Sequence, residues 1–442
     1  MRFILMTVFV GLLLPIMNYP LTDADIAHWV GWAKEISIQF NFLSAATDQA
    51  HGPLLPWLTG CFISLFGDSF WVLNLFNLCC TLFVLGCIYK LVRFSHSESH
   101  SLFSVALAGT CIIIMYFSRT PMYDWPAACF FFGFITYYYL YRQTATQKML
   151  VLALGCIGLA SLSRFSISIG LAGLAMIIYE LWVRDNWQDA IQRIVVMGIS
   201  ILGISFLLNL PWVLSQMVHD PTFLGTFIND NLLRFFRDHP GDVSRRDYYG
   251  FFLYALISLF PWTPLLLAGI SRSFFKDCSS SLERILLVSI LPCLLIFSLS
   301  GHTKLARYIA YIYPGLCTLT ALIYLKNKDN TRYFKRLKGW FFAFFGLLSL
   351  LLIVQVFTFT SETADSPGFV FALIVLLSAL FVSAYLWTKD YQENPLTGNR
   401  VIIATVFYTL FFSYVGYITP QTSFLNEVKQ TIHHSLDTME RP

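Results

Sequence analysis

The sequence predicts an all-α protein that crosses a membrane many times. Of its 442 residues, 57% are hydrophobic and only 12% are charged, whereas soluble domains average about 25% charged residues. The hydrophobic residues form runs that are long enough to span a bilayer, which takes about 17–25 residues. Short polar or proline-containing segments separate these runs. This composition indicates a polytopic membrane protein, and nothing in it resembles a face for binding nucleic acid.

We expect thirteen transmembrane helices. The apolar stretch 53–66 is shorter than a span and contains prolines, so we expect a surface or re-entrant helix there. The helices on either side of Arg164 follow one another closely. The predicted spans lie near 3–19, 69–92, 102–118, 121–141, 147–163, 165–183, 192–215, 249–270, 284–300, 305–325, 338–359, 368–387 and 400–418.

The distribution of Lys and Arg orients these helices. With the N-terminus inside, the inner loops collect most of the 29 basic residues, as cytoplasmic loops do. The densest basic group, at 326–338, is then inside, and a long first loop of about 20–68 is outside. The ten Cys lie mostly within apolar runs and show no metal-binding or CxxC spacing. We interpret them as small buried hydrophobic residues.

Charged residues that need an explanation gather on the outer face. Asp25 opens an amphipathic helix after the first span, where Asp also suits a helix cap. Asp124 and Arg164 lie at the edges of apolar runs, where ionisable groups face a cavity or form a structural pair. Lys304 and Arg307 lie within one helical turn at the start of a span, where they either bind an anion or snorkel to the interface.

The fourth outer loop, 216–248, carries Arg234 in a stretch where basic and aromatic residues alternate. Alternatively, this stretch forms an amphipathic helix at the membrane interface. Taken together, the outer face presents carboxylates beside Lys and Arg at the level of the lipid head groups. This arrangement suits a lipid-linked phosphate, because Arg and Lys bind phosphate oxygens and a carboxylate can accept a proton from a hydroxyl.

The order of these motifs resembles the integral-membrane C-type glycosyltransferases of the protein O-mannosyltransferase and lipid A aminoarabinose transferase superfamily. In "DADIAHWVGWAKEI", Asp25 matches the leading carboxylate of the family and Trp29 its aromatic residue, while Ile26 replaces the usual Glu. In "HGPLLPWLTGCFISLFG", Gly52 replaces the first proline of a Pro-Pro-Leu-x-x-Trp-Leu motif. His51 stands where Lys or His is usual.

Further elements follow in the order of the family, and the resemblance covers about residues 1–325. Asp124 resembles the second carboxylate, and Asp48 stands for the acid before His51, at an unusual spacing. The remaining matches are Arg234-Phe235, Pro261-Trp262, Lys304-Leu305, Tyr308 and Pro314.

The resemblance implies a C-type glycosyltransferase fold with interfacial helices in the first outer loop. It implies a catalytic membrane domain over 1–325, additional helices over 326–418 and a short outer tail over 419–442. The expected activity is an inverting transfer of a hexose or pentose from a polyprenyl-phosphate donor. The acceptor would be a hydroxyl or phosphate of a glycolipid, lipopolysaccharide or protein, at the periplasmic face of a cell inner membrane.

The resemblance also assigns roles to residues. Asp25 is expected to act as general base or to position the acceptor, and Asp124 to support acceptor binding or a metal. A divalent cation is compatible with this scheme, but no ligand spacing in the sequence requires it. The residues expected to bind substrate are Asp48, His51, Arg164, Arg234, Lys304, Arg307 and Tyr308.

The alternative is a transporter or flippase of lipid-linked sugars. Such a protein should show inverted internal repeats and polar residues near the middle of the membrane. The sequence shows neither clearly, and its polar groups concentrate at one face. A purely structural membrane subunit would leave the outer basic clusters unexplained.

Overall fold

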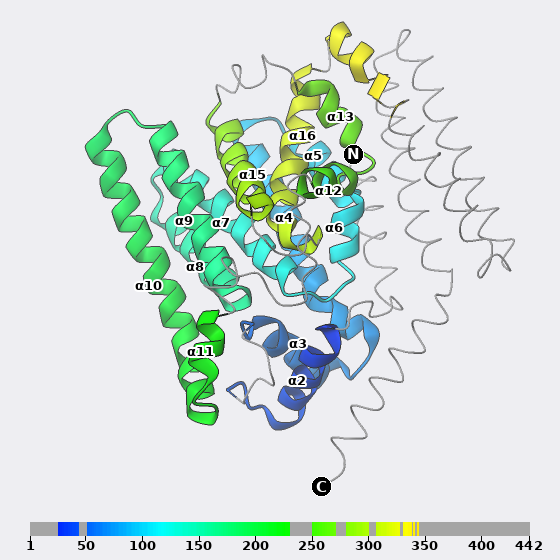
Figure 1. The fold of residues 1–442 in the computed structure, drawn as a ribbon. Coiled ribbons are helices and arrows are strands. Elements are labelled where there is room, and N and C mark those ends of the chain that lie inside the picture. Colours follow the sequence, from blue (N-terminus) through cyan, green and yellow to red (C-terminus); the bar gives the residue numbers. More distant parts are fainter. Residues whose placement is uncertain are drawn as a thin grey trace, which may run out of the picture.

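The computed structural model describes residues 25–43, 51–229, 250–270, 280–299, 306–327 and 330–337, together with residues 339, 340 and 343. Within these ranges the chain is helical and contains no β-strand (Figure 1). The helices are, in chain order, α2 (Asp25–Gln39), α3 (Leu54–Phe66), α4 (Phe70–Ser95), α5 (Glu98–Gly109), α6 (Ile112–Phe117), α7 (Asp124–Thr144), α8 (Gln147–Ser163), α9 (Phe165–Trp182), α10 (Trp187–His219), α11 (Phe223–Ile228), α12 (Gly250–Ser258), α13 (Thr263–Gly269), α15 (Ser281–Leu299), the 3-10 helix η3 (Ala306–Ile312) and α16 (Tyr313–Asn327).

The prediction of an all-α, multi-pass membrane protein is confirmed. In the described part of the chain, five helices are long and apolar enough to cross a membrane, and a bent pair of helices would raise the number to six. The predicted spans near 3–19, 368–387 and 400–418, and nearly all of 338–359, lie outside the described residues. The total of thirteen spans therefore stays a prediction.

Several predicted boundaries agree closely with the helices. The tight pair around Arg164 is present, because α8 ends at Ser163 and α9 begins at Phe165. Arg164 itself has an extended backbone, with φ −141° and ψ 92°. The short apolar stretch forms α3, which has only 13 residues. Arg164 is thus placed at a turn between two helices rather than inside one.

Two predicted spans are each broken into two helices. The run near 102–118 forms α5 and α6, and the run near 249–270 forms α12 and α13, which meet at 115°. Pro261, at the second break, has no backbone N–H to continue a helix. The two breaks are joined by hydrogen bonds. Ile112 N donates to Phe260 O at 3.0 Å, and Trp262 Nε1 donates to Thr110 Oγ1 at 3.1 Å. Irregular backbone at membrane depth is tolerated where protein buries it in this way.

Helix α7 occupies the core of the bundle. Fifteen of its residues are buried, and it packs against α4, α8 and η3. Small residues allow α7 to approach its neighbouring helices closely, as is usual between membrane helices. A Cβ at Gly133 would lie 2.8 Å from the Phe83 ring and 2.9 Å from Cys156 Sγ. The first residue of α7, Asp124, is consequently fixed by the packing of the whole helix.

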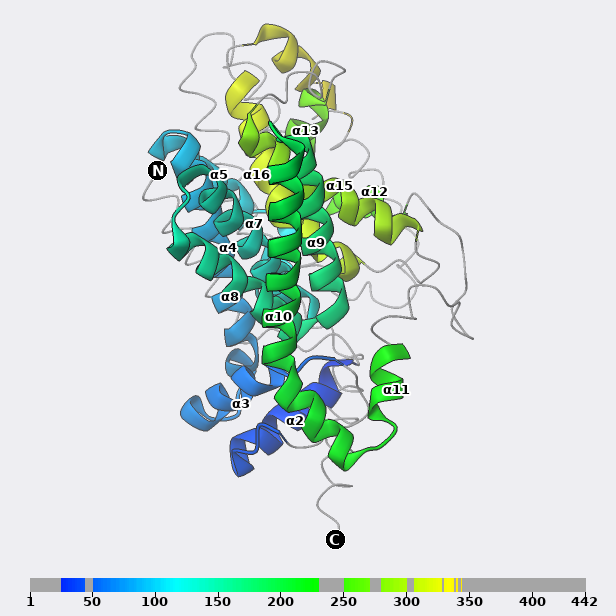
Figure 2. The ribbon, with the colours of Figure 1, turned by 90° about the vertical axis from the view of Figure 1, so that its left-hand side faces the viewer.

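Helices α2, α3 and α11 lie together at one end of the bundle, and the helical segment 331–337 lies at the opposite end (Figures 1 and 2). The described parts of the predicted first outer loop and of the predicted inner loop at 326–338 are therefore at opposite ends, as the alternation of spans requires. Helix α10, at the edge of the bundle, turns apolar side chains outward. Leu207 is 67% exposed and Val218 is 81% exposed, which suits a lipid-facing helix.

Candidate functional site

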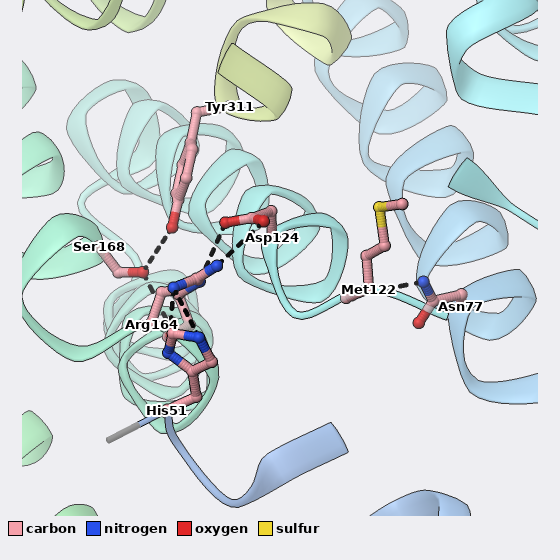
Figure 3. Close-up of polar contacts among 8 residues, drawn as sticks. His51, Asn77, Met122, Asp124, Arg164, Ser168 and Tyr311 are labelled. Atoms are coloured by element: carbon pink, nitrogen blue, oxygen red, sulfur yellow. Dashed lines mark hydrogen bonds and ion pairs between the residues drawn. The ribbon is translucent and has the colours of Figure 1, made fainter. Parts of the chain in front are cut away.

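The structure brings Asp124 and Arg164 together at the end of the bundle that carries α2 and α3. Arg164 Nη2 donates to Asp124 Oδ2 at 3.1 Å, and Arg164 Nε lies 3.0 Å from Asp124 Oδ1 (Figure 3). Their side chains are only 15% and 4% exposed. A guanidinium that faces both oxygens of a carboxylate is held in place as well as neutralised. This ion pair joins α7 to the turn between α8 and α9.

His51 contacts the same guanidinium. Arg164 Nη1 lies 3.1 Å from His51 Nδ1 and 3.5 Å from His51 Nε2, and the His51 and Tyr123 rings are 5.1 Å apart. The Arg164 nitrogen lies almost equally far from both ring nitrogens, so the guanidinium packs over the imidazole ring. Figure 3 shows His51 and Asp124 on either side of Arg164.

Gly52 explains why His51 reaches this position. Its N–H donates to Ser163 O at 3.3 Å, at the end of α8. A Cβ on residue 52 would lie 1.9 Å from Leu162 O, so no larger residue fits without moving the chain. The departure from the family motif at Gly52 therefore coincides with a close backbone contact, and this contact holds His51 next to Arg164.

A second layer of hydroxyl groups supports the cluster. Ser168 Oγ donates to Ala160 O at 3.1 Å and lies 3.2 Å from the Tyr311 hydroxyl. Tyr311 is buried and points toward the Asp124–Arg164 pair (Figure 3). Neither Ser168 nor Tyr311 is among the site residues predicted from the sequence. The signal for Tyr311 was its position one helical turn after Tyr308, in the same motif.

Helix α4 anchors the segment that leads into Asp124. Asn77 Nδ2, fully buried, donates to Thr120 O at 2.6 Å. Thr81 Oγ1 accepts a hydrogen bond from Trp125 Nε1 at 2.8 Å. Asn77 is also not among the residues predicted from the sequence, although a polar amide within an apolar run is a signal for a residue that anchors neighbouring segments. These bonds fix the backbone on both sides of Asp124.

Helix α2 is anchored beside the site by aromatic contacts. The Trp29 ring lies 6.4 Å from the Tyr123 ring. On its other side, Trp32 stacks on the fully buried Trp212 of α10 at 6.5 Å, and Phe223 of α11 packs on Trp212. The helix that Asp25 begins thus contacts the residue before α7, through Trp29, and α10, through Trp32.

The negative charge of Asp124 offsets the positive charge of Arg164. Burial alone would lower the pKa of Arg164, but Asp124, followed by Tyr311, outweighs that effect, so the pKa of Arg164 is raised. Arg164 therefore stays charged. Both Asp124 oxygens face it, and among the described residues no group of three His, Cys, Asp or Glu side chains could hold a metal ion.

The remaining predicted site residues fall into two groups. Arg307 and Tyr308 lie in η3, which packs against α7, and Tyr308 is close enough to Arg164 to contribute to its pKa. Asp25 is the first residue of α2, but its side chain is outside the description. The residues that lie entirely outside the described ranges are Asp48, Arg234 and Lys304.

Sequence comparisons point to one group of membrane enzymes. A family model described as dolichyl-phosphate-mannose-protein mannosyltransferase matches residues 50–212. An undecaprenyl phosphate-alpha-4-amino-4-deoxy-L-arabinose arabinosyl transferase of Photorhabdus laumondii is 20% identical over 393 residues, which are 86% of this chain and 68% of that protein. The protein of the same name from Pectobacterium carotovorum is 29% identical over 182 residues, or 41% of this chain and 32% of that protein.

Solved structures of ArnT from Cupriavidus metallidurans share the fold. The apo structure matches with a TM-score of 0.73, and the structure bound to undecaprenyl phosphate with a TM-score of 0.76. Each match has 16% sequence identity and covers 94% of this chain and 76% of that chain. At this identity the likeness shows a common architecture.

Proposed function

We propose that this chain is a member of the protein O-mannosyltransferase and lipid A aminoarabinose transferase superfamily of C-type glycosyltransferases and transfers a sugar from a polyprenyl-phosphate donor. The observation that carries the proposal is the Asp124–Arg164–His51 cluster, in which Asp124 is buried and which lies at the bundle end next to α2. The relatives named above are transferases, which favours transfer over transport.

The proposed reaction inverts the anomeric carbon. A hydroxyl or phosphate of the acceptor attacks that carbon, the bond to the donor phosphate breaks, and the phosphate leaves with the bonding electrons. Cationic groups stabilise this developing charge without a strong acid. We assign this role to Arg234 and Lys304. We assign substrate binding to Arg164, in the turn after α8, and to Arg307 and Tyr308, in η3.

The two carboxylates receive different roles. Both oxygens of Asp124 face Arg164, which favours a role in fixing that guanidinium and the acceptor rather than in accepting a proton. Asp25 is then the proposed general base, and Asp48 contributes to substrate binding in the same outer loop. In this proposal the site faces the periplasm from a cell inner membrane. Residues 1–325 form the catalytic domain, 326–418 add helices and 419–442 form a tail.

The direct test is a transfer assay. The purified protein is mixed with a radiolabelled polyprenyl-phosphate sugar and with membranes from cells that lack it. We expect label to move into a glycolipid, lipopolysaccharide or protein fraction. Arg164→Gln should abolish this transfer, and Asp185→Asn, at an exposed residue beyond α9, should not. Movement of intact donor across proteoliposomes without transfer would instead support a flippase.

A further inference from the structure

The segment that leads into Asp124 is buried without being helical. Helix α6 ends at Phe117 and α7 begins at Asp124, and every residue from 118 to 123 is buried between them. Buried carbonyl groups that are not paired within a helix need donors from elsewhere in the fold. The position of Asp124 therefore depends on the side chains that supply these donors.

Asn77 of α4 supplies donors with its amide group. Asn77 Nδ2 donates to Thr120 O at 2.6 Å, and it lies 3.4 Å from Phe117 O and 3.5 Å from Met122 O. Figure 3 shows the Asn77 amide directed toward Met122, two residues before Asp124. An amide nitrogen carries two hydrogens, so Thr120 O takes the short bond and the other two carbonyls share the second hydrogen.

Thr81 contacts the other side of Asp124. It lies one turn after Asn77 on α4, and its Oγ1 donates to Asn77 O at 2.9 Å. A hydroxyl has one hydrogen, so this bond directs the lone pairs of Oγ1 to accept from Trp125 Nε1, which donates at 2.8 Å. The fully buried Trp125 ring stacks on Phe117 with 5.1 Å between the ring centroids. Helix α4 thus binds residues on both sides of Asp124 through two side chains.

The position of Asp124 in turn sets the position of Arg164. Both carboxylate oxygens of Asp124 face this guanidinium, so a shift of the first turn of α7 would move the guanidinium as well. Loss of the Asn77 amide would leave Thr120 O buried without its donor. The backbone would then have to move to find another partner, because an unpaired buried carbonyl group is costly.

We infer that Asn77 and Thr81 are positioning residues for the transfer reaction, which hold the Asp124 carboxylate, and through it Arg164, in the geometry that the reaction uses. The inference rests on the proposed function for the identity of the reaction. A misplacement of about 1 Å, caused far from the chemistry, can cost on the order of 100-fold in rate. These hydrogen bonds from α4 therefore contribute to turnover as well as to helix packing.

Asn74 provides a matched control. It lies one turn before Asn77 on the same helix, and both residues are 0% exposed. In the part of the chain that the structure describes, neither polar atom of the Asn74 amide has a hydrogen-bond partner. Asn74→Ala and Asn77→Ala therefore remove the same atoms from the same helix, but of the two only Asn77→Ala removes bonds to the segment before Asp124.

The test measures turnover at saturating concentrations of a radiolabelled polyprenyl-phosphate sugar, with full-length protein in detergent and acceptor membranes. Each variant is assayed below its midpoint of thermal unfolding, so that only folded protein is compared. We expect Asn77→Ala to lower turnover by up to about 100-fold and Asn74→Ala to leave it unchanged. Thr81→Val keeps the shape of the side chain without its hydroxyl. It should also lower turnover, and it replaces Asn77→Ala in every comparison if Asn77→Ala does not fold.

A double-variant cycle with Asp124→Asn tests whether Asn77 acts through Asp124. If it does, Asn77→Ala should cost much less turnover in the Asp124→Asn background than in the wild-type protein, because effects of residues that act through one another are not additive. A purely structural residue would lower the unfolding midpoint and leave the turnover of folded protein unchanged.

Three results would overturn the inference: wild-type turnover in the folded variant, equal losses in Asn74→Ala and Asn77→Ala, or additive losses in the double variant. Absence of transfer by the wild-type protein would instead remove the proposed function, and the inference about turnover with it. Transfer by the wild-type protein with any of the three results would remove the positioning role alone.

Discussion

Arg193 Nε of α10 lies 2.7 Å from Glu180 Oε2 of α9, and the Glu180 side chain is fully buried. The other carboxylate oxygen accepts bonds from two residues of α7: Arg142 Nε at 2.5 Å and the Tyr138 hydroxyl at 2.7 Å. Three helices are therefore joined at the end of the bundle opposite to Asp124.

Removing the charge of Glu180 should destabilise the protein. Glu180→Gln would leave Arg142 and Arg193 close together without their shared carboxylate. Breaking a buried ion pair on one side costs about 3–5 kcal/mol. We expect a clear fall in the midpoint of thermal unfolding in detergent. Asp185→Asn is the matched control, because Asp185 is an exposed acid near the same helix ends. An unchanged midpoint in Glu180→Gln would contradict the stabilising role of the Glu180 ion pairs.

Glu180 also shows where reasoning from the sequence was incomplete. The positions of Lys and Arg that orient the spans count Arg142 and Arg193 only as basic residues of inner loops. The structure uses both to neutralise an acid within an apolar run, "AMIIYELWV". A lone Glu in such a run was the available signal. What could not be read from the sequence is which of several nearby Arg residues would reach it.

The close approach at Gly52 predicts a large effect of one added methyl group. In Gly52→Ala the new Cβ would meet Leu162 O at 1.9 Å, so residues 51 and 52 must shift relative to the end of α8, next to Arg164. A misplacement of about 1 Å in a site can reduce activity on the order of 100-fold. Transfer activity should fall on this scale while the protein remains folded.

A glycine on α8 serves as control for that experiment. A Cβ on Gly155 has no atom within 4 Å, so Gly155→Ala should retain transfer activity. Equal activities of Gly52→Ala and Gly155→Ala would show that the position of His51 does not matter for transfer.

The Asp124–Arg164 pair can be tested for a role beyond structure. Asp124→Asn and Arg164→Gln each leave one buried charge without its partner, so each should lower stability. The double variant removes both charges and should recover part of that stability, with a coupling of about 0.5–3 kcal/mol. Thermal unfolding of the four proteins gives this coupling.

Transfer activity distinguishes the two roles of the pair. If the ion pair serves only to join helices, activity should return together with stability in the double variant. The proposed function requires that activity stay lost, because Arg164 would no longer face the phosphate. Recovery of full activity would place the pair among the structural contacts.

The architecture of the site could be predicted only in part. Apolar runs located the helices, and the position of Arg164 between two close spans was correct. The contact of His51 with Arg164 joins residues 113 positions apart, and no local pattern encodes such a distance. It depends on Gly52 packing against the end of α8, a tertiary contact that helix periodicity does not contain.

The final prediction concerns the proposed base at the start of α2. Asp25→Asn keeps the shape of the side chain but cannot accept a proton. General-base catalysis contributes about 10²–10⁴-fold, so turnover should fall on that scale. Binding of a radiolabelled polyprenyl-phosphate sugar should survive, because the base acts on the acceptor rather than on the lipid phosphate.

Asp23→Asn is the internal control for Asp25→Asn. If the acids only cap and solvate a helix start, both substitutions should have small and similar effects. The enzyme proposal requires asymmetry, with a severe loss for Asp25→Asn and a mild one for Asp23→Asn. Purified variants in detergent allow binding and transfer to be measured separately. Full transfer by Asp25→Asn would return Asp25 to a capping role and leave the Trp29 and Trp32 contacts as the reason that α2 lies beside the site.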